Sequence, residues 1–273
     1  MRGYFIKGVV MKSVLITGAY GGMGYATAKE LASQGYTVFA LDKTVKEEEE
    51  NIIPVQADLT DIESVKTAFE RVKSCTDKLD AIVHFAGVYM LDSLVEISET
   101  AFNTIVKVNF YGAFYINKTF LPLLTKGSKI LITTSELAPL DPLPFTGLYA
   151  VTKGALDKYA YSLKMELQLL GISVSVLRAG AVSTGMLGVS TNALDSFCEN
   201  TKLYECNAKR FKKIVDSVEA KSVSPEKIAK KTKKILDKKH PKFVYKINRN
   251  KLLLLLNLLP KSWQCKIIKK ILK

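Results

Sequence analysis

The sequence predicts an α/β protein with a single doubly wound parallel sheet of about seven strands and helices on both faces of the sheet. Two observations predict this fold. Short runs rich in Val, Ile and Leu alternate with longer amphipathic stretches, and strands that are buried on both faces are typical of parallel sheets. The length of 273 residues also suits one domain, because a single hydrophobic core grows to roughly 250 residues before chains divide.

The predicted elements follow one another as strand and helix. Runs with the length and composition of buried strands are Ser13–Thr17, Thr37–Leu41, Ile52–Gln56, Ala81–Phe85, Lys129–Thr134, Ser173–Leu177 and Phe243–Tyr245. Stretches with helical periodicity are Met23–Gln34, Ile62–Ser74, Glu99–Thr125 and Tyr149–Leu170, and a further helix opens at Pro225 and runs to about Lys239. We interpret residues 12–247 as the α/β domain, 1–11 as a short extension and 248–273 as a separate tail.

The charge of the chain is concentrated at its C-terminal end. Residues 1–208 hold 19 Lys and Arg against 22 Asp and Glu, whereas residues 209–273 hold 21 against 4, and the whole chain has a net charge of +14. An anionic partner would therefore bind the tail. Nucleic acid is disfavoured because no nucleic-acid-binding motif is present.

Four cysteines, Cys75, Cys198, Cys206 and Cys265, form no CxxC pair and lie near no histidine cluster. We read them as reduced thiols and expect no metal site. The first residues lack the small-residue cleavage site of a signal peptide. We therefore expect a cytoplasmic protein, with peripheral attachment to a membrane left open.

A glycine-rich turn joins the first predicted strand to the first helix. Its sequence from Thr17 to Gly24 is TGAYGGMG. Backbone N–H groups and a helix N-terminus at such a turn can hold a pyrophosphate. Gly18 permits the turn, Gly22 lets the backbone approach phosphate, and Gly24 lets the helix pack close to the strand. The turn predicts a Rossmann-like nucleotide site.

Asp42 ends the second predicted strand, 18 residues beyond Gly24. A carboxylate at that place accepts hydrogen bonds from the adenosine ribose hydroxyls and repels the 2′-phosphate of NADP. Lys43 could offset that repulsion, so NAD is favoured over NADP without excluding it. The structural alternative is that Asp42 caps a loop. Asp58, followed by Leu59 after the third strand, is placed to accept from the adenine amino group.

Tyr149 and Lys153 are four residues apart on a predicted helix and therefore share one helix face. A tyrosine is a poor base at neutral pH, but a neighbouring ammonium and a positive nicotinamide ring are expected to lower its pKa. The pair could then exchange a proton with an alcohol or a carbonyl. Ser135 ends the fifth strand, fourteen residues before Tyr149, at the sheet edge where parallel α/β proteins bind ligands.

Together these motifs resemble the short-chain dehydrogenase/reductase family from Lys12 to about Tyr245. The resemblance rests on TGAYGGMG, Asp42 with Asp58-Leu59, Asn109 in the middle helix, and Ser135 with Tyr149-x-x-x-Lys153. It implies a tyrosine that exchanges the proton and a lysine that binds the nicotinamide ribose. It also implies a serine that orients the substrate oxygen and an asparagine that holds a relay water. The implied cofactor contacts are Gly18, Tyr20, Gly22, Met23, Gly24, Asp42, Asp58, Leu59, Ala86, Gly87, Tyr149, Lys153, Val182 and Thr184.

The chain departs from the family pattern in three places. His84-Phe85-Ala86-Gly87 stands where the family has Asn-Asn-Ala-Gly, and we read His84 as a structural residue at a strand end. Ala179-Gly180 replaces Pro-Gly after the sixth strand. The interval from Ser135 to Tyr149 is one residue longer than is common.

Two segments are expected to shape the substrate pocket. Leu137–Phe145 is apolar and contains three prolines, and Met186–Phe197 corresponds to the variable substrate loop of the family. They suit a hydrophobic alcohol or ketone such as a steroid, a retinoid or a lipid, as in hydroxysteroid or retinol dehydrogenases, although the same residues could simply pack the loop. The predicted activity is NAD(H)-dependent interconversion of an alcohol and a ketone or aldehyde. The alternatives are a nucleotide-binding scaffold or sensor without turnover, and an epimerase or dehydratase.

The tail has the pattern of an interfacial helix. Leu252–Leu259 is too short to cross a bilayer, which takes about 20 residues. Beyond Pro260, apolar residues recur on one face and lysines fill the other, as in helices that lie on anionic membranes. Residues 249–273 could therefore bind a membrane surface, or the leucines could dock on the domain or on a second subunit. The family resemblance further implies a homodimer or homotetramer.

Overall fold

The sheet of the computed structural model, which describes residues 12–219 and 221–273, has seven parallel strands in the order β3-β2-β1-β4-β5-β6-β7. The strands are β1 Ser13–Thr17, β2 Thr37–Asp42, β3 Ile52–Gln56, β4 Leu79–His84, β5 Leu124–Ser135, β6 Ser173–Ala179 and β7 Val244–Ile247. The order reverses between β1 and β4, which opens a crevice at the carboxyl ends of these strands. The predicted fold class is confirmed. The extension 1–11 lies outside the described residues.

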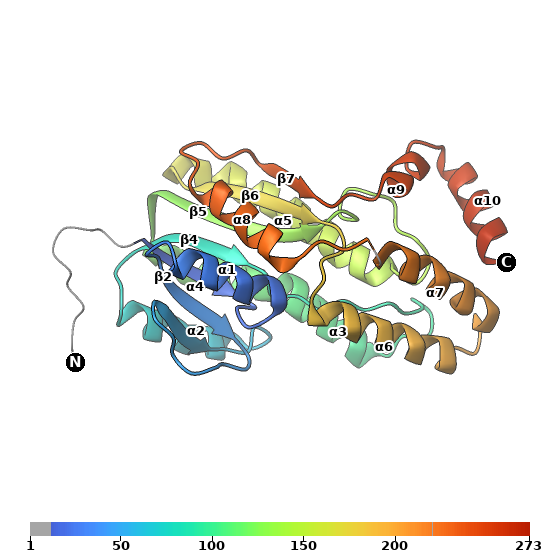
Figure 1. Cartoon of the computed structure of the whole chain (residues 1–273), viewed down its shortest axis with the longest axis horizontal. Coiled ribbons are helices and arrows are strands. Elements are labelled where there is room, and N and C mark those ends of the chain that lie inside the picture. The colour runs from blue at the N-terminus through green and yellow to red at the C-terminus, as the bar shows by residue number, and fades with distance from the viewer. Residues whose placement is uncertain (1–11, 220) are drawn as a thin grey trace.

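Helices cover both faces of the sheet (Figure 1). Helices α2 Ile62–Lys73, α4 Gly112–Phe120 and α5 Gly147–Leu167 bury one core against it, and α1 Gly22–Ala32 and α8 Pro225–Leu236 bury the other. The strands read as continuous apolar runs for this reason: Val14, Leu15 and Ile16 of β1 alternate between the two cores and are all fully buried.

The predicted helix Glu99–Thr125 is divided in the structure. It consists of α3 Glu99–Val106, a π-helical turn over Lys107–Tyr111, α4, and a 3₁₀ turn over Leu121–Leu123, after which β5 begins at Leu124. A π turn inserts one residue into a helix without disturbing its apolar pattern greatly, so periodicity does not reveal it. The prediction also ran too far at its end, because the apolar LPLL sequence continues the pattern into the strand.

The segment that we expected to be a loop over Met186–Phe197 lies within α6 Gly185–Asn200. Together with α7 Glu205–Glu219, this helix extends beyond the carboxyl ends of the strands (Figure 1). Phe197 of α6 and Phe211 of α7 pack against Phe145, with ring centroids 4.8 and 5.4 Å apart. The proline-rich segment before α5 therefore packs against both helices through Phe145.

The C-terminal residues form α9 Lys251–Leu256 and α10 Lys261–Leu272. Ile268 and Leu272 pack into the cluster that α6 and α7 form, and Asn207 of α7 donates a hydrogen bond to the Leu272 carbonyl at 2.6 Å. The buried Gln264 donates to Asp141 at 3.0 Å. One side of the tail thus docks on the domain. Among the described helices, none is long and apolar enough to cross a membrane.

Candidate active site

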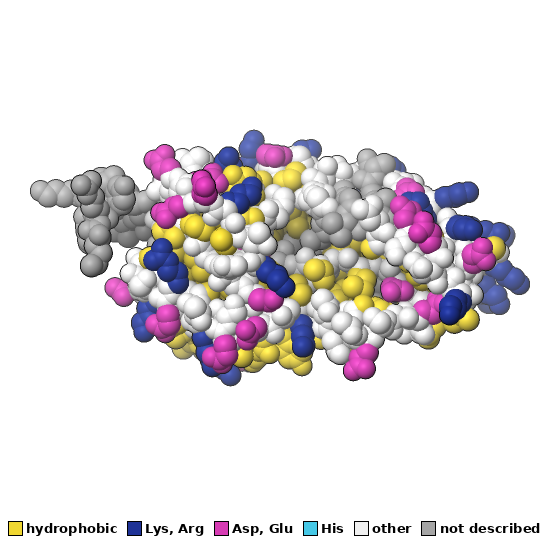
Figure 2. All heavy atoms as spheres, turned by 90° about the horizontal axis from the view of Figure 1, so that it is seen from below, with side chains coloured by type: hydrophobic (Ala, Val, Ile, Leu, Met, Phe, Trp, Pro, Cys, Tyr) yellow, Lys and Arg dark blue, Asp and Glu magenta, His cyan; other side chains and the backbone are white. Residues whose placement is uncertain are grey.

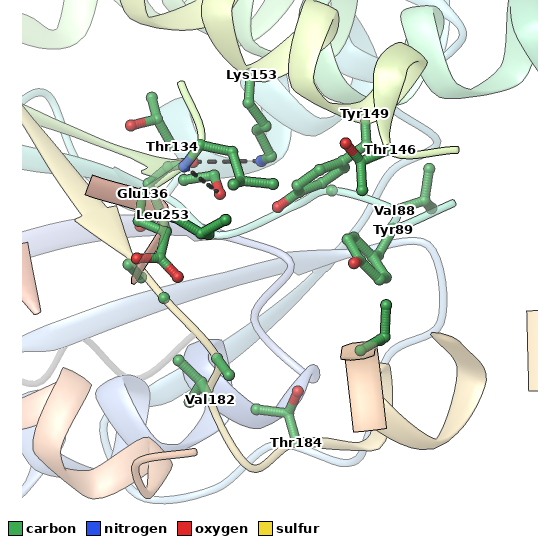
Figure 3. A pocket seen from close by; sticks show the side chains of 18 of the residues that line it. Val88, Tyr89, Thr134, Glu136, Thr146, Tyr149, Lys153, Val182, Thr184 and Leu253 are labelled. Atoms are coloured by element: carbon green, nitrogen blue, oxygen red, sulfur yellow. Dashed lines mark hydrogen bonds between the residues drawn. The ribbon is translucent and has the colours of Figure 1, made fainter. Parts of the chain in front are cut away.

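The pocket lies at the carboxyl ends of the strands, and residues of α7 and α9 line its wall. Figure 3 shows side chains that surround it, among them Tyr149, Lys153, Glu136 and Leu253. The pocket brings together seven of the predicted site residues: Met23, Gly87, Ser135, Tyr149, Lys153, Val182 and Thr184. These residues come from five different parts of the chain, and all of them lie at the carboxyl edge of the sheet. Gly18, Gly22 and Gly24 follow β1, Asp42 is the last residue of β2, and Asp58 and Leu59 follow β3.

Tyr149 and Lys153 project from α5 toward the end of β5. Lys153 is buried and Tyr149 is half-buried, and the Lys153 Nζ lies 5.8 Å from the centre of the Tyr149 ring. The ammonium donates to the Thr133 carbonyl at 3.4 Å. Ser135 hydrogen-bonds the Tyr149 side chain, and its Oγ also accepts the Leu137 N–H at 3.2 Å. The predicted Ser-Tyr-Lys group is therefore assembled in one place.

The electrostatics of this group differ from our expectation. Burial raises the pKa of Tyr149 to about 12, although the Ser135 hydrogen bond lowers it, and the Glu136 charge raises it further. Burial also lowers the pKa of Lys153 to about 8. The protein's own groups therefore do not lower the pKa of Tyr149 as expected. The free energy lost when the phenolate is removed from water exceeds the stabilisation that the neighbouring groups give it. The phenol is protonated at neutral pH, which suits a general acid.

Asn109 lies in the π turn and is buried. Its Oδ1 accepts the Val88 N–H at 2.8 Å, and its Nδ2 donates to the Val88 carbonyl at 3.0 Å and to Thr152 Oγ1 at 3.1 Å. The side chain therefore ties the segment after β4 to α5. A Cβ added to Gly87 would meet Lys153 Nζ at 3.2 Å and Asn109 Oδ1 at 3.3 Å, so a glycine there keeps the lysine and the asparagine close together.

The glycine turn has the features that a pyrophosphate requires. Gly18 has a φ of +65°, and a Cβ there would lie 2.6 Å from the Ala86 nitrogen. A Cβ on Gly24 would collide with the Gly18 carbonyl. Helix α1 has no side-chain cap and no acidic residue in its first turn, so its N-terminal N–H groups are available to an anion. These residues fit a dinucleotide. A Cβ on Gly22 would also meet the Thr184 side chain at 2.6 Å.

Asp42 lies at the end of β2 beside the glycine turn. Its carboxylate accepts the backbone N–H groups of Tyr20 at 2.9 Å and of Lys43 at 2.8 Å. The Lys43 side chain turns away to Asp58, 2.9 Å from its Oδ2. This ion pair and hydrogen bonds from Thr60 lower the pKa of Asp58 to about 2. Leu59 is buried next to Gly112 of α4.

His84 ends β4 and is buried. Its Nε2 lies 2.9 Å from Asn117 Oδ1, and burial lowers its pKa to about 4. It does not line the pocket, in line with the structural role that the sequence suggested.

Several residues that line the pocket were not predicted from the sequence. Tyr89 packs edge-on against Tyr149, with ring centroids 4.6 Å apart. Glu136 is a buried carboxylate directly after Ser135. Phe211, Ile214 and Val215 of α7 and Leu253 of α9 complete the apolar wall. The one available signal was Glu136, a charged residue at the end of an otherwise buried strand.

The sequence profile described as short chain dehydrogenase matches residues 12–195. The chain belongs to this family, which agrees with the order and geometry of the motifs above.

Two curated relatives illustrate the range of similar proteins. Estradiol 17-beta-dehydrogenase 2 of Mus musculus is 36% identical over 192 residues, which cover 66% of this chain and 50% of that protein. The chain thus spans about half the length of this relative and of the corresponding protein of Rattus norvegicus. The 3-ketodihydrosphingosine reductase of Bacteroides thetaiotaomicron is 26% identical over 235 residues, with 86% and 87% of the two chains covered.

Solved structures share the fold. A short chain dehydrogenase family protein from Francisella tularensis superposes with a TM-score of 0.73 at 22% identity, over 87% of this chain and 97% of the other. A 3-ketoacyl-(acyl-carrier-protein) reductase from Brucella melitensis, complexed with NADH, superposes with a TM-score of 0.70 at 22% identity, over 86% and 96% of the two chains.

Proposed function

We propose that the protein is an NAD(H)-dependent oxidoreductase that interconverts a hydrophobic secondary alcohol and its ketone. The observation that carries the proposal is the convergence of Ser135, Tyr149 and Lys153 on one apolar pocket beside a glycine turn. Family membership supports oxidoreduction. Neither a binding scaffold nor a sensor requires these three side chains together.

In this proposal the residues of the chain position the substrate and move one proton. Ser135 holds the substrate oxygen next to the Tyr149 hydroxyl. Tyr149 gives its proton to that oxygen during reduction and takes it back during oxidation, and Lys153 stabilises the phenolate that remains. The glycine turn with α1 would hold the cofactor pyrophosphate, and Gly87, Val182 and Thr184 would hold the nicotinamide end. A bound nicotinamide supplies or accepts the hydride.

The pocket wall supports an apolar substrate. Leu137, Leu143, Phe211, Val215 and Leu253 face the same cavity as Tyr149. Two relatives, an estradiol dehydrogenase and a ketodihydrosphingosine reductase, carry names of steroid and lipid substrates. We therefore propose a substrate of steroid or lipid type.

Tyr149→Phe tests the mechanism. Purified protein with NAD should oxidise an apolar secondary alcohol, and the variant should lose about 10²–10⁴-fold in kcat/KM, the usual contribution of a general acid–base. Binding of NADH, followed by calorimetry, should persist in the variant. Undiminished turnover would overturn the assigned role of Tyr149.

The proposed preference for NAD rests on Asp42. Lys43, the cation nearest to it in sequence, is paired with Asp58, so the Asp42 charge is left to repel a 2′-phosphate. Side-by-side titration with NADH and NADPH should show tighter binding of NADH. Equal or tighter binding of NADPH would contradict the preference.

We also propose that α9 and α10 bind an anionic membrane surface beside the pocket mouth. Leu252, Leu255, Leu258 and Trp263 are 74%, 60%, 79% and 59% exposed. Exposed lysines flank them at 251, 261 and 266, and Figure 2 shows Lys and Arg side chains gathered at the end of the molecule where α6, α7 and α10 lie. Exposed apolar side chains bordered by lysines are typical of interfacial helices, and each lysine near an anionic leaflet contributes about 1 kcal/mol.

Cosedimentation with phosphatidylserine vesicles tests this surface. The full chain should pellet with the vesicles, and Leu258→Ser with Trp263→Ser should reduce pelleting severalfold. Leu169→Ser is the matched control, because Leu169 is 83% exposed but follows α5 at the opposite edge of the sheet. Equal pelleting of all variants would exclude the proposed surface.

A homodimer is proposed through the outer faces of α3, α4 and α5. Phe102, Tyr111, Phe114 and Val151 are exposed there, and an exposed apolar patch of this kind is typical of a subunit interface. Sedimentation of the purified protein measures the state directly, and Phe114→Asp should convert a dimer to monomers.

A further inference from the structure

A carboxylate stands in the apolar part of the pocket, at Glu136. The residue is 8% exposed and lines the cavity together with Tyr149 and Leu253 (Figure 3). Its backbone N–H donates to the Ala179 carbonyl at 2.9 Å, which holds it between the ends of β5 and β6. The side chain therefore has a fixed origin next to Ser135.

One oxygen of this carboxylate is used by the protein. The Glu136 Oε2 accepts the backbone N–H of Asn250, which precedes α9, at 2.6 Å. The other oxygen lies close to Gly180, where an added Cβ would come within 3.0 Å of Oε1. A side chain at 180 would collide first with the Asn248 carbonyl and would also crowd the carboxylate, so this glycine lets both groups lie close to the end of β6.

The second oxygen accepts no hydrogen bond from the residues that the structure describes. Burial raises the pKa of Glu136, while the Asn250 N–H and the Arg249 charge act to lower it. A buried carboxylate with one backbone donor is costly. A leucine or methionine would pack the same wall at no such cost, so anchoring of the tail does not by itself account for a carboxylate here.

We propose that Glu136 determines substrate specificity, its Oε1 accepting a hydrogen bond from a hydroxyl or ammonium group carried close to the reacting carbon of an otherwise apolar substrate. The inference rests on the proposed alcohol–ketone activity and adds a requirement to it. Glu136 is adjacent to Ser135 in the chain and lines the same cavity as Tyr149, so a group that it binds lies near the substrate oxygen. A substrate without a donor leaves the carboxylate unpaired, which is the basis of strong discrimination by polar pockets.

The test compares three versions of one long-chain ketone. The carbon next to the carbonyl carries hydrogen, hydroxyl or ammonium, and reduction is followed by the loss of NADH absorbance. Wild-type protein should prefer one donor-bearing version to the unsubstituted ketone by at least about tenfold in kcat/KM. Glu136→Gln should reduce that preference at least about threefold while a glutamine oxygen still accepts from Asn250. The readout is the ratio of the donor-bearing to the unsubstituted ketone, because loss of the Glu136 charge also acts on Tyr149 and alters the rate with every ketone. Whether hydroxyl or ammonium is preferred identifies the donor.

A control variant separates substrate recognition from docking of the tail. Asn250→Ala removes the Oδ1 that accepts the Leu252 and Leu253 N–H groups at 2.9 and 3.3 Å but retains the backbone N–H that binds Glu136. It should affect all three ketones by the same factor. If Glu136→Gln also affects all three by the same factor, or if the wild type shows no preference among them, the proposal is overturned.

Binding measurements keep this result distinct from failure of the proposed activity. Calorimetric titration of the three ketones and NADH is done in a Tyr149→Phe background, with and without Glu136→Gln, because this background is expected to bind NADH but not to reduce the ketones, so each titration gives a Kd without turnover. If none of them is reduced, the proposed activity fails for this substrate class, whereas a Kd preference that disappears in Glu136→Gln still supports the binding role. Identical Kd values in both proteins would refute it.

Discussion

The Lys43 ammonium lies 2.9 Å from the Asp58 carboxylate and so faces away from Asp42, its neighbour in the chain. The pair is largely exposed, with Lys43 76% accessible, and contributes little to stability. Its consequence is electrostatic, because it leaves the Asp42 charge without a cation at the position where an adenosine ribose would lie. The identity of residue 42 should therefore govern the choice of cofactor.

Asp42→Ser should raise kcat/KM for NADPH relative to NADH by at least about tenfold, since two charges about 4 Å apart near a protein surface repel by 1–4 kcal/mol. The ratio of the two rates with one ketone measures it. Asp77→Ser is the control, because Asp77 is exposed before β4 at the amino edge of the sheet. An unchanged ratio in Asp42→Ser would place cofactor selection elsewhere.

Gly24→Ala should impair NADH binding more than about tenfold and lower the melting temperature. A Cβ at 24 meets the Gly18 carbonyl and, at 2.8 Å, the Ala19 Cα, so the backbone of the turn has to move. Gly185→Ala is the matched control, since a Cβ there meets nothing within 4 Å. Calorimetric NADH titration and thermal unfolding of both variants give the comparison, and wild-type binding by Gly24→Ala would show that the close packing of this turn is not required.

Much of the fold and part of the site could be predicted, because they depend on residues that are close together in the sequence. Strand Ser13–Thr17 was predicted to the residue, since an apolar run between Lys12 and a glycine turn has one reasonable interpretation. Tyr149 and Lys153 were identified from their spacing on one helix. The pocket wall was not predictable in the same way. Leu253 is one of five consecutive leucines, and its place in the pocket is decided by how the tail docks, which depends on Glu136, Asp141 and Asn207 far away in the sequence.

Two further differences between prediction and structure also depend on tertiary contacts, namely the π turn at Asn109 and the pKa of Tyr149. The π turn at Asn109 leaves the helical pattern almost intact, so the sequence does not reveal it. In the structure this turn lets Asn109 hydrogen-bond both Val88 and Thr152. Lys153 and a bound nicotinamide together were expected to lower the pKa of Tyr149. The effect of the nicotinamide stays a prediction, whereas burial is a property that the sequence does not measure. In the structure burial prevails and raises that pKa to about 12.

Asp157→Asn should destabilise the fold by about 3–5 kcal/mol, the range for breaking one partner of a buried ion pair. Asp157 accepts Arg178 Nε at 3.0 Å and Nη2 at 2.7 Å, and both side chains are largely buried between α5 and β6. Urea unfolding measures the loss. Glu63→Gln, which removes the exposed pair with Lys66, should cost less than about 1 kcal/mol. Similar losses in the two variants would mean that the Asp157 pair is no stronger than a surface pair.

His84 should make the stability of the protein fall in mild acid. Burial holds its folded pKa at about 4, below its ordinary value of 6.5, so between these two values the unfolded chain binds a proton that the folded chain does not. The free energy of unfolding therefore loses a contribution as the pH falls from 6.5 to 4. A shift of that size corresponds to about 3 kcal/mol.

Urea unfolding at several pH values, compared between variants, isolates this contribution from that of the carboxylates. His84→Gln retains an N–H donor for Asn117 but does not titrate, so its stability should decline less than that of the wild type over this range. His240, the second histidine of the chain, is exposed after α8, and His240→Gln should follow the wild-type curve. If the free energy of unfolding depends on pH in the same way in the His84 and His240 variants, His84 is not the group responsible. The folded protein would then accommodate a charged His84 ring beside Asn117.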